Sequence, residues 1–127
     1  MTLYSLLMTL LIFPLLEEPL TFALALEAQS ESRIWWNVVR VESHGMKNVR
    51  SDSNACCRLQ VLGGRYGNPS CRLLEDDGWI CVLAATRQYE RCRAMCGKRR
   101  AWECYHSGKC LEPGSYTRKV LRRSHHE

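Results

Sequence analysis

All eight cysteines of this 127-residue chain lie between Cys56 and Cys110. They are Cys56, Cys57, Cys71, Cys81, Cys92, Cys96, Cys104 and Cys110. An even and dense set in a short chain is typical of a disulfide framework. A core of this size is marginal without cross-links. The sequence therefore predicts a small disulfide-rich domain.

An apolar segment opens the chain, and we interpret residues 1–25 as a secretory signal peptide. Ala23-Leu24-Ala25 offers the small residues that a signal peptidase needs, and cleavage after Ala28 is the alternative. Pro14 and the pair Glu17-Glu18 interrupt the apolar run, whereas a membrane-spanning helix needs ~20 apolar residues. Because disulfides persist outside the cell, we expect a secreted, extracellular protein.

The remaining chain divides into three parts. Residues 26–54 form an N-terminal extension, in which the β-branched and aromatic residues of 34–41 favour a strand and 43–54 read as a flexible connector. Residues 55–112 hold the cysteines and form the predicted domain. Residues 113–127 are a basic tail, which we expect to be disordered.

Short strands are predicted inside the cysteine-rich domain. Residues 57–71 have the form of a hairpin that turns at Gly63-Gly64. Residues 79–83 suggest another short strand, and 89–100 one or two helical turns. We therefore expect β-fingers with little other regular secondary structure.

No pattern in the sequence predicts a metal centre, a cofactor or catalysis. Cys92 and Cys96 have zinc-like spacing and His106 lies nearby, but a second matching pair is missing. No phosphate-binding glycine loop and no nucleophile motif occurs. We interpret the basic and aromatic residues 98–102 as a solvated loop rather than a nucleic-acid site. The sequence thus predicts a protein that is not an enzyme, with no nucleic-acid partner.

Three segments around the first four cysteines resemble the prokineticin-domain family, and most closely the astakines, the arthropod cytokines of that family. The segments are Cys56-Cys57-Arg58-Leu59, Arg65-Tyr66-Gly67-Asn68-Pro69-Ser70-Cys71 and Gly78-Trp79-Ile80-Cys81. The resemblance implies a colipase-like fold of short β-fingers around a disulfide-bonded centre. One departure from the family is that the family has two further cysteines before the adjacent pair. Others are the three residues between Cys92 and Cys96, where the family commonly has Cys-Pro-Cys, and the absence of the Ala-Val-Ile-Thr-Gly-Ala start of vertebrate prokineticins.

The resemblance also implies a bonding order. Carried onto this chain, the family's order gives Cys56–Cys92, Cys81–Cys104 and Cys96–Cys110. Cys57 and Cys71 are left without family partners, and a bond between them would complete the set.

Finally, the resemblance implies a secreted cytokine or growth factor that binds a cell-surface receptor or another membrane protein. A venom or salivary toxin on the same scaffold and a secreted enzyme inhibitor are the alternatives. The formal net charge of +5 makes an anionic glycan a further candidate partner. Arginine and aromatic side chains are favoured in binding hot spots. The candidate contact residues are Arg58, Arg65, Tyr66, Lys98, Arg99, Arg100 and Trp102.

Overall fold

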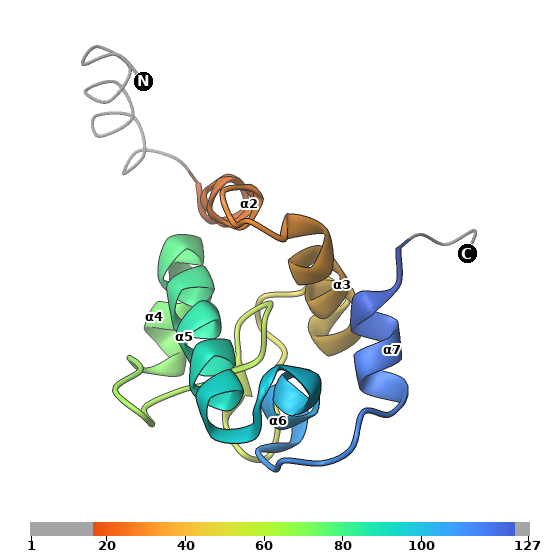
Figure 1. Cartoon of the computed structure of the whole chain (residues 1–127). Helices are drawn as coiled ribbons and strands as arrows, with labels where there is room; N and C mark the ends of the chain where they lie inside the picture. Colours follow the sequence, from red (N-terminus) through yellow and green to blue (C-terminus); the bar gives the residue numbers. More distant parts are fainter. Residues whose placement is uncertain (1–16, 124–127) are drawn as a thin grey trace, which may run out of the picture.

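The fold is helical, and its longest helix, α5, lies at its centre (Figure 1). The computed structural model describes residues 17–123, so most of the predicted signal peptide and the last residues of the tail lie outside it. The elements are α2 (Glu18–Glu27), α3 (Ser32–Ser43), β1 (Ala55–Cys56), β2 (Val61–Leu62), α4 (Cys71–Asp76), α5 (Gly78–Cys96), the 3₁₀ turn η2 (Lys98–Arg100), α6 (Ala101–Ser107) and α7 (Ser115–Leu121). The expectation of a β-finger fold with little regular structure is therefore wrong.

Helix α5 forms where a strand was expected at 79–83. Asp77 caps its first turn by accepting a hydrogen bond from the backbone N–H of Ile80 (3.1 Å). The helix ends at Gly97, whose φ of +85° favours glycine. The residues between these signals are good helix formers such as Ala84, Ala85 and Gln88. The capping residues at both ends of the helix thus outweigh the β-favouring composition of residues 79–83.

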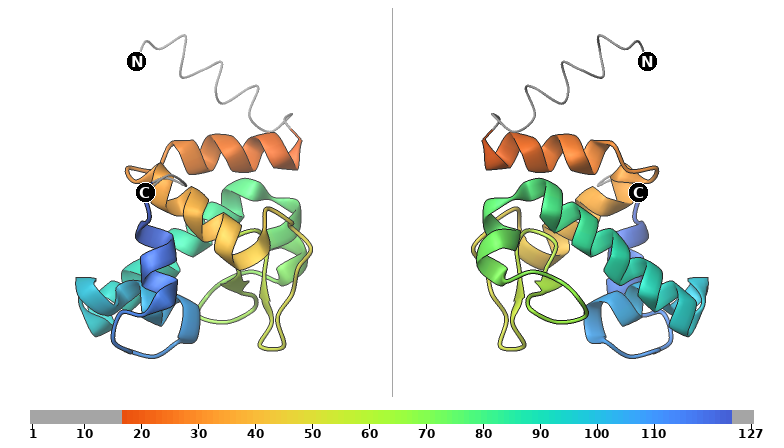
Figure 2. Two further views of the ribbon diagram at one scale, coloured as in Figure 1. Left: turned by 90° about the vertical axis from the view of Figure 1, so that its right-hand side faces the viewer. Right: turned by 90° about the vertical axis from the view of Figure 1, so that its left-hand side faces the viewer.

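Helix α2 packs closely across the start of α5, at one end of the molecule (Figure 2). A Cβ atom placed on Gly78 would lie 2.5 Å from the backbone of Phe22, so only glycine permits this approach. Phe22, Ala25 and Leu26 are buried in the core. Cleavage after Ala25 stays a prediction, but it would remove most of α2 from this packing. None of the described helices is long and apolar enough to cross a bilayer.

Residues 34–41, expected to form a strand, lie within helix α3. Ile34, Trp35, Val38 and Val39 are all buried, and their spacing places them on one face of a helix. Helix α3 packs beside α7, which occupies part of the tail expected to be disordered (Figure 2). The helical spacing of the apolar residues therefore determines the secondary structure of this segment, although their composition favours a strand.

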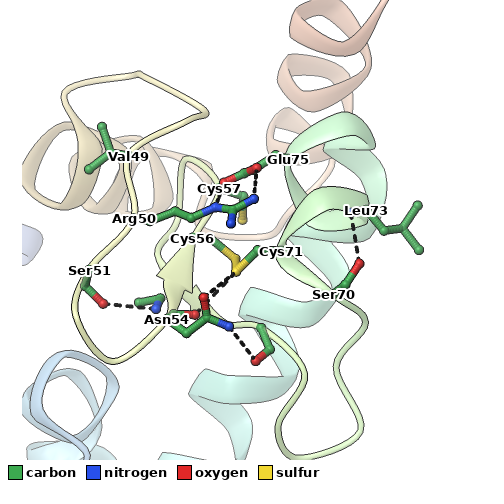
Figure 3. A network of polar contacts seen from close by, with 12 residues as sticks. Val49, Arg50, Ser51, Asn54, Cys56, Cys57, Ser70, Cys71, Leu73 and Glu75 are labelled. Atoms are coloured by element: carbon green, nitrogen blue, oxygen red, sulfur yellow. Dashed lines mark hydrogen bonds and ion pairs between the residues drawn. A yellow bond between two sulfur atoms is a disulfide. The ribbon is translucent and has the colours of Figure 1, made fainter.

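The two-stranded sheet is tiny, and its turn differs from the expected one. Ala55 pairs with Leu62 and Cys56 with Val61, so the turn spans residues 57–60 instead of Gly63-Gly64. Figure 3 shows the surroundings of this hairpin: Arg50 reaches both carboxylate oxygens of Glu75 at 2.8 Å, beside the Cys56–Cys71 bond. The hairpin is thus fastened to α4 covalently.

All eight cysteines form disulfides, as expected, but most pairs differ from those that the resemblance implied. The bonds are Cys56–Cys71, Cys57–Cys81, Cys92–Cys104 and Cys96–Cys110. Only Cys96–Cys110 was expected, and the other three expected pairs are wrong.

Helix geometry explains the difference. Cys81 and Cys92 lie on the same helix, roughly 16 Å apart at 1.5 Å per residue. The adjacent cysteines of the hairpin can reach α4 and the start of α5, while Cys92 lies at the other end of α5 beside α6. A fold built from β-fingers would not separate these residues in this way.

Candidate functional site

Two of the seven predicted contact residues are engaged inside the protein. Arg58 forms an ion pair with Glu18, and its guanidinium lies 5.1 Å from the ring centroid of Phe22. Trp102 is buried, with its ring 5.2 Å from that of Trp35. These two side chains stabilise the core and are not free to bind a partner.

The other predicted contact residues lie nearer the surface but do not form one patch with a common function. Arg99 and Arg100 both pair with Glu112, and Lys98 and Arg65 are exposed. Tyr66 is the most exposed of the aromatic side chains in the described chain, at 65 %. The structure therefore brings the basic residues 98–100 together and places Tyr66 on a different element.

A different residue, Glu42, has the environment of a reactive group. It lies in the last turn of α3 and its side chain is only 10 % exposed. Its Oε2 accepts a 2.9 Å hydrogen bond from the hydroxyl of Tyr116 on α7 and lies 3.4 Å from Nδ1 of His106 on α6. Three helices thus converge on one carboxyl group.

Burial raises the pKa of Glu42 above its ordinary value, and this effect outweighs the opposing influence of Tyr116 and His106. The negative end of the α3 dipole also disfavours a carboxylate in the last turn of the helix. No arginine or lysine of the described residues is among the groups that shift this pKa. The surroundings of Glu42 therefore raise its pKa above that of an exposed glutamate.

The aromatic groups next to Glu42 pack against one another. The rings of His106 and Tyr116 stack with centroids 4.3 Å apart and planes inclined by 14°. Burial raises the pKa of Tyr116 and that of Tyr105 well above the ordinary value, so both phenols stay neutral near pH 7. Tyr105 donates a 2.7 Å hydrogen bond to the backbone carbonyl of Leu59. Each phenol thus acts as a hydrogen-bond donor held in place by packing.

Other buried carboxylates of the described chain behave in the opposite way. Burial would raise the pKa of Glu103, but hydrogen bonds from the backbone of Gly114 and from Thr117 lower it overall. The hydrogen bond and charge of Arg50 lower the pKa of Glu75. Glu42 is therefore distinguished by a missing strong partner rather than by burial alone.

Other reactive groups are scarce in the described residues. All eight thiols are consumed in disulfides, and no group of His, Cys, Asp or Glu within residues 17–123 is arranged to hold a metal ion. The hydroxyl of Ser43, next to Glu42, donates to backbone carbonyls of Val39 and Arg58. What this arrangement offers chemically is one acidic proton on a partly accessible carboxyl group.

Comparison with known proteins adds no family: no family model, no curated protein and no solved structure matches this chain. Nothing in these comparisons identifies a prokineticin or an astakine.

Glu42 was not among the residues that the sequence pointed to. The signal was nevertheless present, because Glu42 continues the buried stripe of α3 at four residues after Val38 and seven after Trp35. A carboxyl group at an apolar position of a helix indicates either a buried ion pair or a perturbed acid. A strand over residues 34–41 does not have this helical spacing, so the predicted strand did not point to Glu42.

Proposed function

We propose that the protein is a secreted enzyme that breaks glycosidic bonds by general acid catalysis, with Glu42 as the acid. The observation that carries the proposal is the raised pKa of a partly accessible carboxyl group that no described arginine or lysine neutralises. Perturbed acids of this kind are concentrated at functional sites. The sequence predicted a protein that is not an enzyme, and this proposal departs from that prediction.

The reaction class follows from what one acidic proton can do. Cleavage of a glycosidic bond needs a protonated carboxyl group that donates to the leaving oxygen, and lysozyme keeps such a glutamate protonated by burial. Acyl transfer would instead need an activated nucleophile and an oxyanion hole. Because the described thiols are bonded and Ser43 is hydrogen-bonded to carbonyls, we propose glycosidic cleavage rather than acyl transfer. Most glycosidases pair the acid with a second carboxyl group, and Glu42 supplies the acid alone.

In the proposed step, Glu42 transfers its proton to the glycosidic oxygen as the bond from that oxygen to the sugar carbon breaks. Water adds to the sugar carbon, and its proton restores Glu42 to the acid form. Tyr116 and His106 hold the carboxyl group in one orientation. The proton is available only below the pKa of Glu42, so activity should fall as the pH rises through that value.

Secretion is supported by the four disulfides, since such bonds persist in oxidising compartments and are rare in the cytosol. The oxidised protein should therefore be prepared from a secretory host, so that the fold of the site is intact.

The test is the release of reducing ends from a panel of polysaccharides, including chitin and bacterial cell wall, by wild-type protein, Glu42→Gln and Glu90→Gln. Glu90 is an exposed glutamate of α5, and its substitution makes the same change of charge. We expect Glu42→Gln to lose activity by about 10²-fold or more, the usual contribution of a general acid. Equal activity of the two variants would exclude Glu42 as the acid, and wild-type protein inactive on every polysaccharide would exclude the proposed reaction.

The receptor-binding cytokine, the toxin and the enzyme inhibitor stay predictions. The resemblance behind them implied a β-finger fold, which this helical chain does not have.

A further inference from the structure

A hollow between α5 and the loop after β2 is lined by Tyr66, Asn68, Arg87, Gln88 and Arg91. Two of these residues, Arg87 and Arg91, stand one turn apart on α5. Like charges at this spacing repel each other on a helix. Within residues 17–123 neither guanidinium is in an ion pair with a carboxylate. The hollow therefore holds two positive charges that no described carboxylate neutralises.

Arg91 is held in this hollow by an aromatic ring. The central carbon of its guanidinium lies 3.4 Å from the centroid of the Tyr66 ring, a close cation–π contact. Tyr66 has a φ of +55°, a conformation that a bulky residue seldom adopts. The backbone is thus bent in the one way that places this exposed ring over Arg91.

One nitrogen of that guanidinium has no acceptor. Nη1 of Arg91 is buried and makes no hydrogen bond in the described part of the chain. A buried donor on a charged group is costly when it is left unpaired. Arg87 is better satisfied, because its Nη2 donates to Oδ1 of Asn68 at 3.1 Å. Arg91 is therefore the less satisfied of the two guanidinium groups. Because Nη1 itself is buried, a ligand in the hollow would bind the other N–H groups of Arg91.

The floor of the hollow is also fixed. Oε1 of Gln88 accepts from the backbone N–H of Leu62 (3.3 Å), and its Nε2 donates to the carbonyl of Tyr105 (3.4 Å). Asn68 donates to the carbonyl of Leu62 at 3.0 Å. These bonds join α5, the β2 loop and α6, so the two arginines project from a framework that does not have to be ordered by a ligand.

We propose that this hollow binds an oxyanion, namely a sulfate or phosphate group, which accepts hydrogen bonds from Arg91 and Arg87. Guanidinium groups match the geometry of such oxygens, and the hydrogen bonds are strong because both partners are charged. Tyr66 limits the size of the ligand by covering one side of Arg91. The group enters either as a free ion or as a substituent of a sulfated glycan. This site is independent of the acid proposed at Glu42.

The test is calorimetric titration of the wild-type protein with sodium sulfate, with sodium phosphate and with a heparin-derived oligosaccharide, using sodium chloride at equal ionic strength as the control. Arg91→Gln and Arg87→Gln are compared with Arg93→Gln. Arg93 is exposed on α5 and does not line the hollow, so its removal makes the same change of charge elsewhere. Thermal unfolding verifies that each variant is folded.

We expect Arg91→Gln to weaken binding about tenfold, the effect of losing one hydrogen bond to a charged group, and Arg93→Gln to change it less than about twofold. Arg87→Gln, on an exposed side chain, should also weaken binding and gives a second reading if Arg91→Gln does not fold. Binding of the free ions identifies an ion site, and binding of the oligosaccharide alone identifies a glycan site. The proposal is overturned if no anion binds beyond the chloride control, or if all three variants lose affinity equally. Glu42→Gln should bind as the wild type does.

Discussion

The phenol of Tyr116 donates a 2.9 Å hydrogen bond to Oε2 of Glu42, across 74 residues of sequence and between two helices packed side by side. This bond fixes the orientation of a carboxyl group whose pKa burial has raised. A phenol can hold a protonated or an ionised carboxyl group, whereas an arginine would force ionisation. Tyr116 therefore orients the carboxyl group and lowers its pKa without reversing the effect of burial.

Glu42 should make the protein less stable at neutral pH than an uncharged residue would. Its pKa is higher in the folded than in the unfolded state, so its favourable contribution is present below the unfolded value and is lost as the pH rises through the folded value. Glu42→Gln should consequently raise Tm at pH 7 and leave it nearly unchanged at pH 4. Each pKa unit corresponds to about 1.4 kcal/mol, and each kcal/mol to roughly 4–8 °C in a domain of about this size. Lower stability of the variant at pH 7 would contradict this account of the site.

Glu103 should show the opposite dependence on pH. Its folded pKa is lowered, so its contribution is present above the unfolded pKa and is lost as the pH falls through the folded value. Thr117→Val removes the 2.9 Å hydrogen bond from the threonine hydroxyl. We expect a loss of about 1.5–3 kcal/mol near pH 7 that shrinks toward acid pH in urea unfolding. Thr117→Ser keeps the hydroxyl and is the control, and an equal loss in both variants would assign the effect to packing.

Helix α2 should be required for folding. Phe22 is 2 % exposed and its backbone crosses α5 at Gly78. Phe22→Ala should therefore cost about 3–5 kcal/mol in the free energy of unfolding, whereas Leu24→Ala, on an exposed residue of the same helix, should cost far less. The intact mass of the secreted protein completes the test. A stable mature chain that begins after Ala25 would show that the core closes without α2.

The disulfide pairs distinguish the helical fold from the family pattern that the sequence suggested. We expect peptides that link Cys57 to Cys81 and Cys92 to Cys104 after proteolysis without reduction and tandem mass spectrometry. Replacing Cys57 and Cys81 together by alanine should leave the other bonds intact. It should cost about 3 kcal/mol in the chain-entropy model. A peptide linking Cys81 to Cys104 would contradict the fold described here.

That all eight cysteines form disulfides could be predicted from sequence, because their number and density imply a framework, but which cysteines pair could not. The helices could not, because two signals conflicted. Residues 34–41 have a β-favouring composition, yet the burial of Ile34, Trp35, Val38 and Val39 follows the helical period. At α5, residues 79–83 have a strand-like composition, yet the side chain of Asp77 caps a helix that begins just before them. The spacing of the apolar residues in α3 and the capping residues of α5 predict these helices better than composition does.

The candidate site was beyond sequence reasoning for a related reason. Glu42, His106 and Tyr116 come from three separate helices, and only packing brings them together. Trp102 and Arg58 have the composition of a contact surface, but their environments are those of core residues. Residue type alone predicted that these two side chains bind a partner, whereas their burial shows that they pack inside the protein.

The most direct test of the proposed acid is the pH dependence of polysaccharide cleavage, measured beside the NMR titration of the Glu42 carboxyl carbon in wild-type protein and in Tyr116→Phe. The hydrogen bond from Tyr116 lowers the pKa of Glu42, so its loss should raise that pKa. We predict that the pH above which activity falls coincides with the titration of Glu42 and moves upward with it in Tyr116→Phe. A limit that stays in place while the Glu42 titration moves, or activity that persists after Glu42 has ionised, would contradict the account.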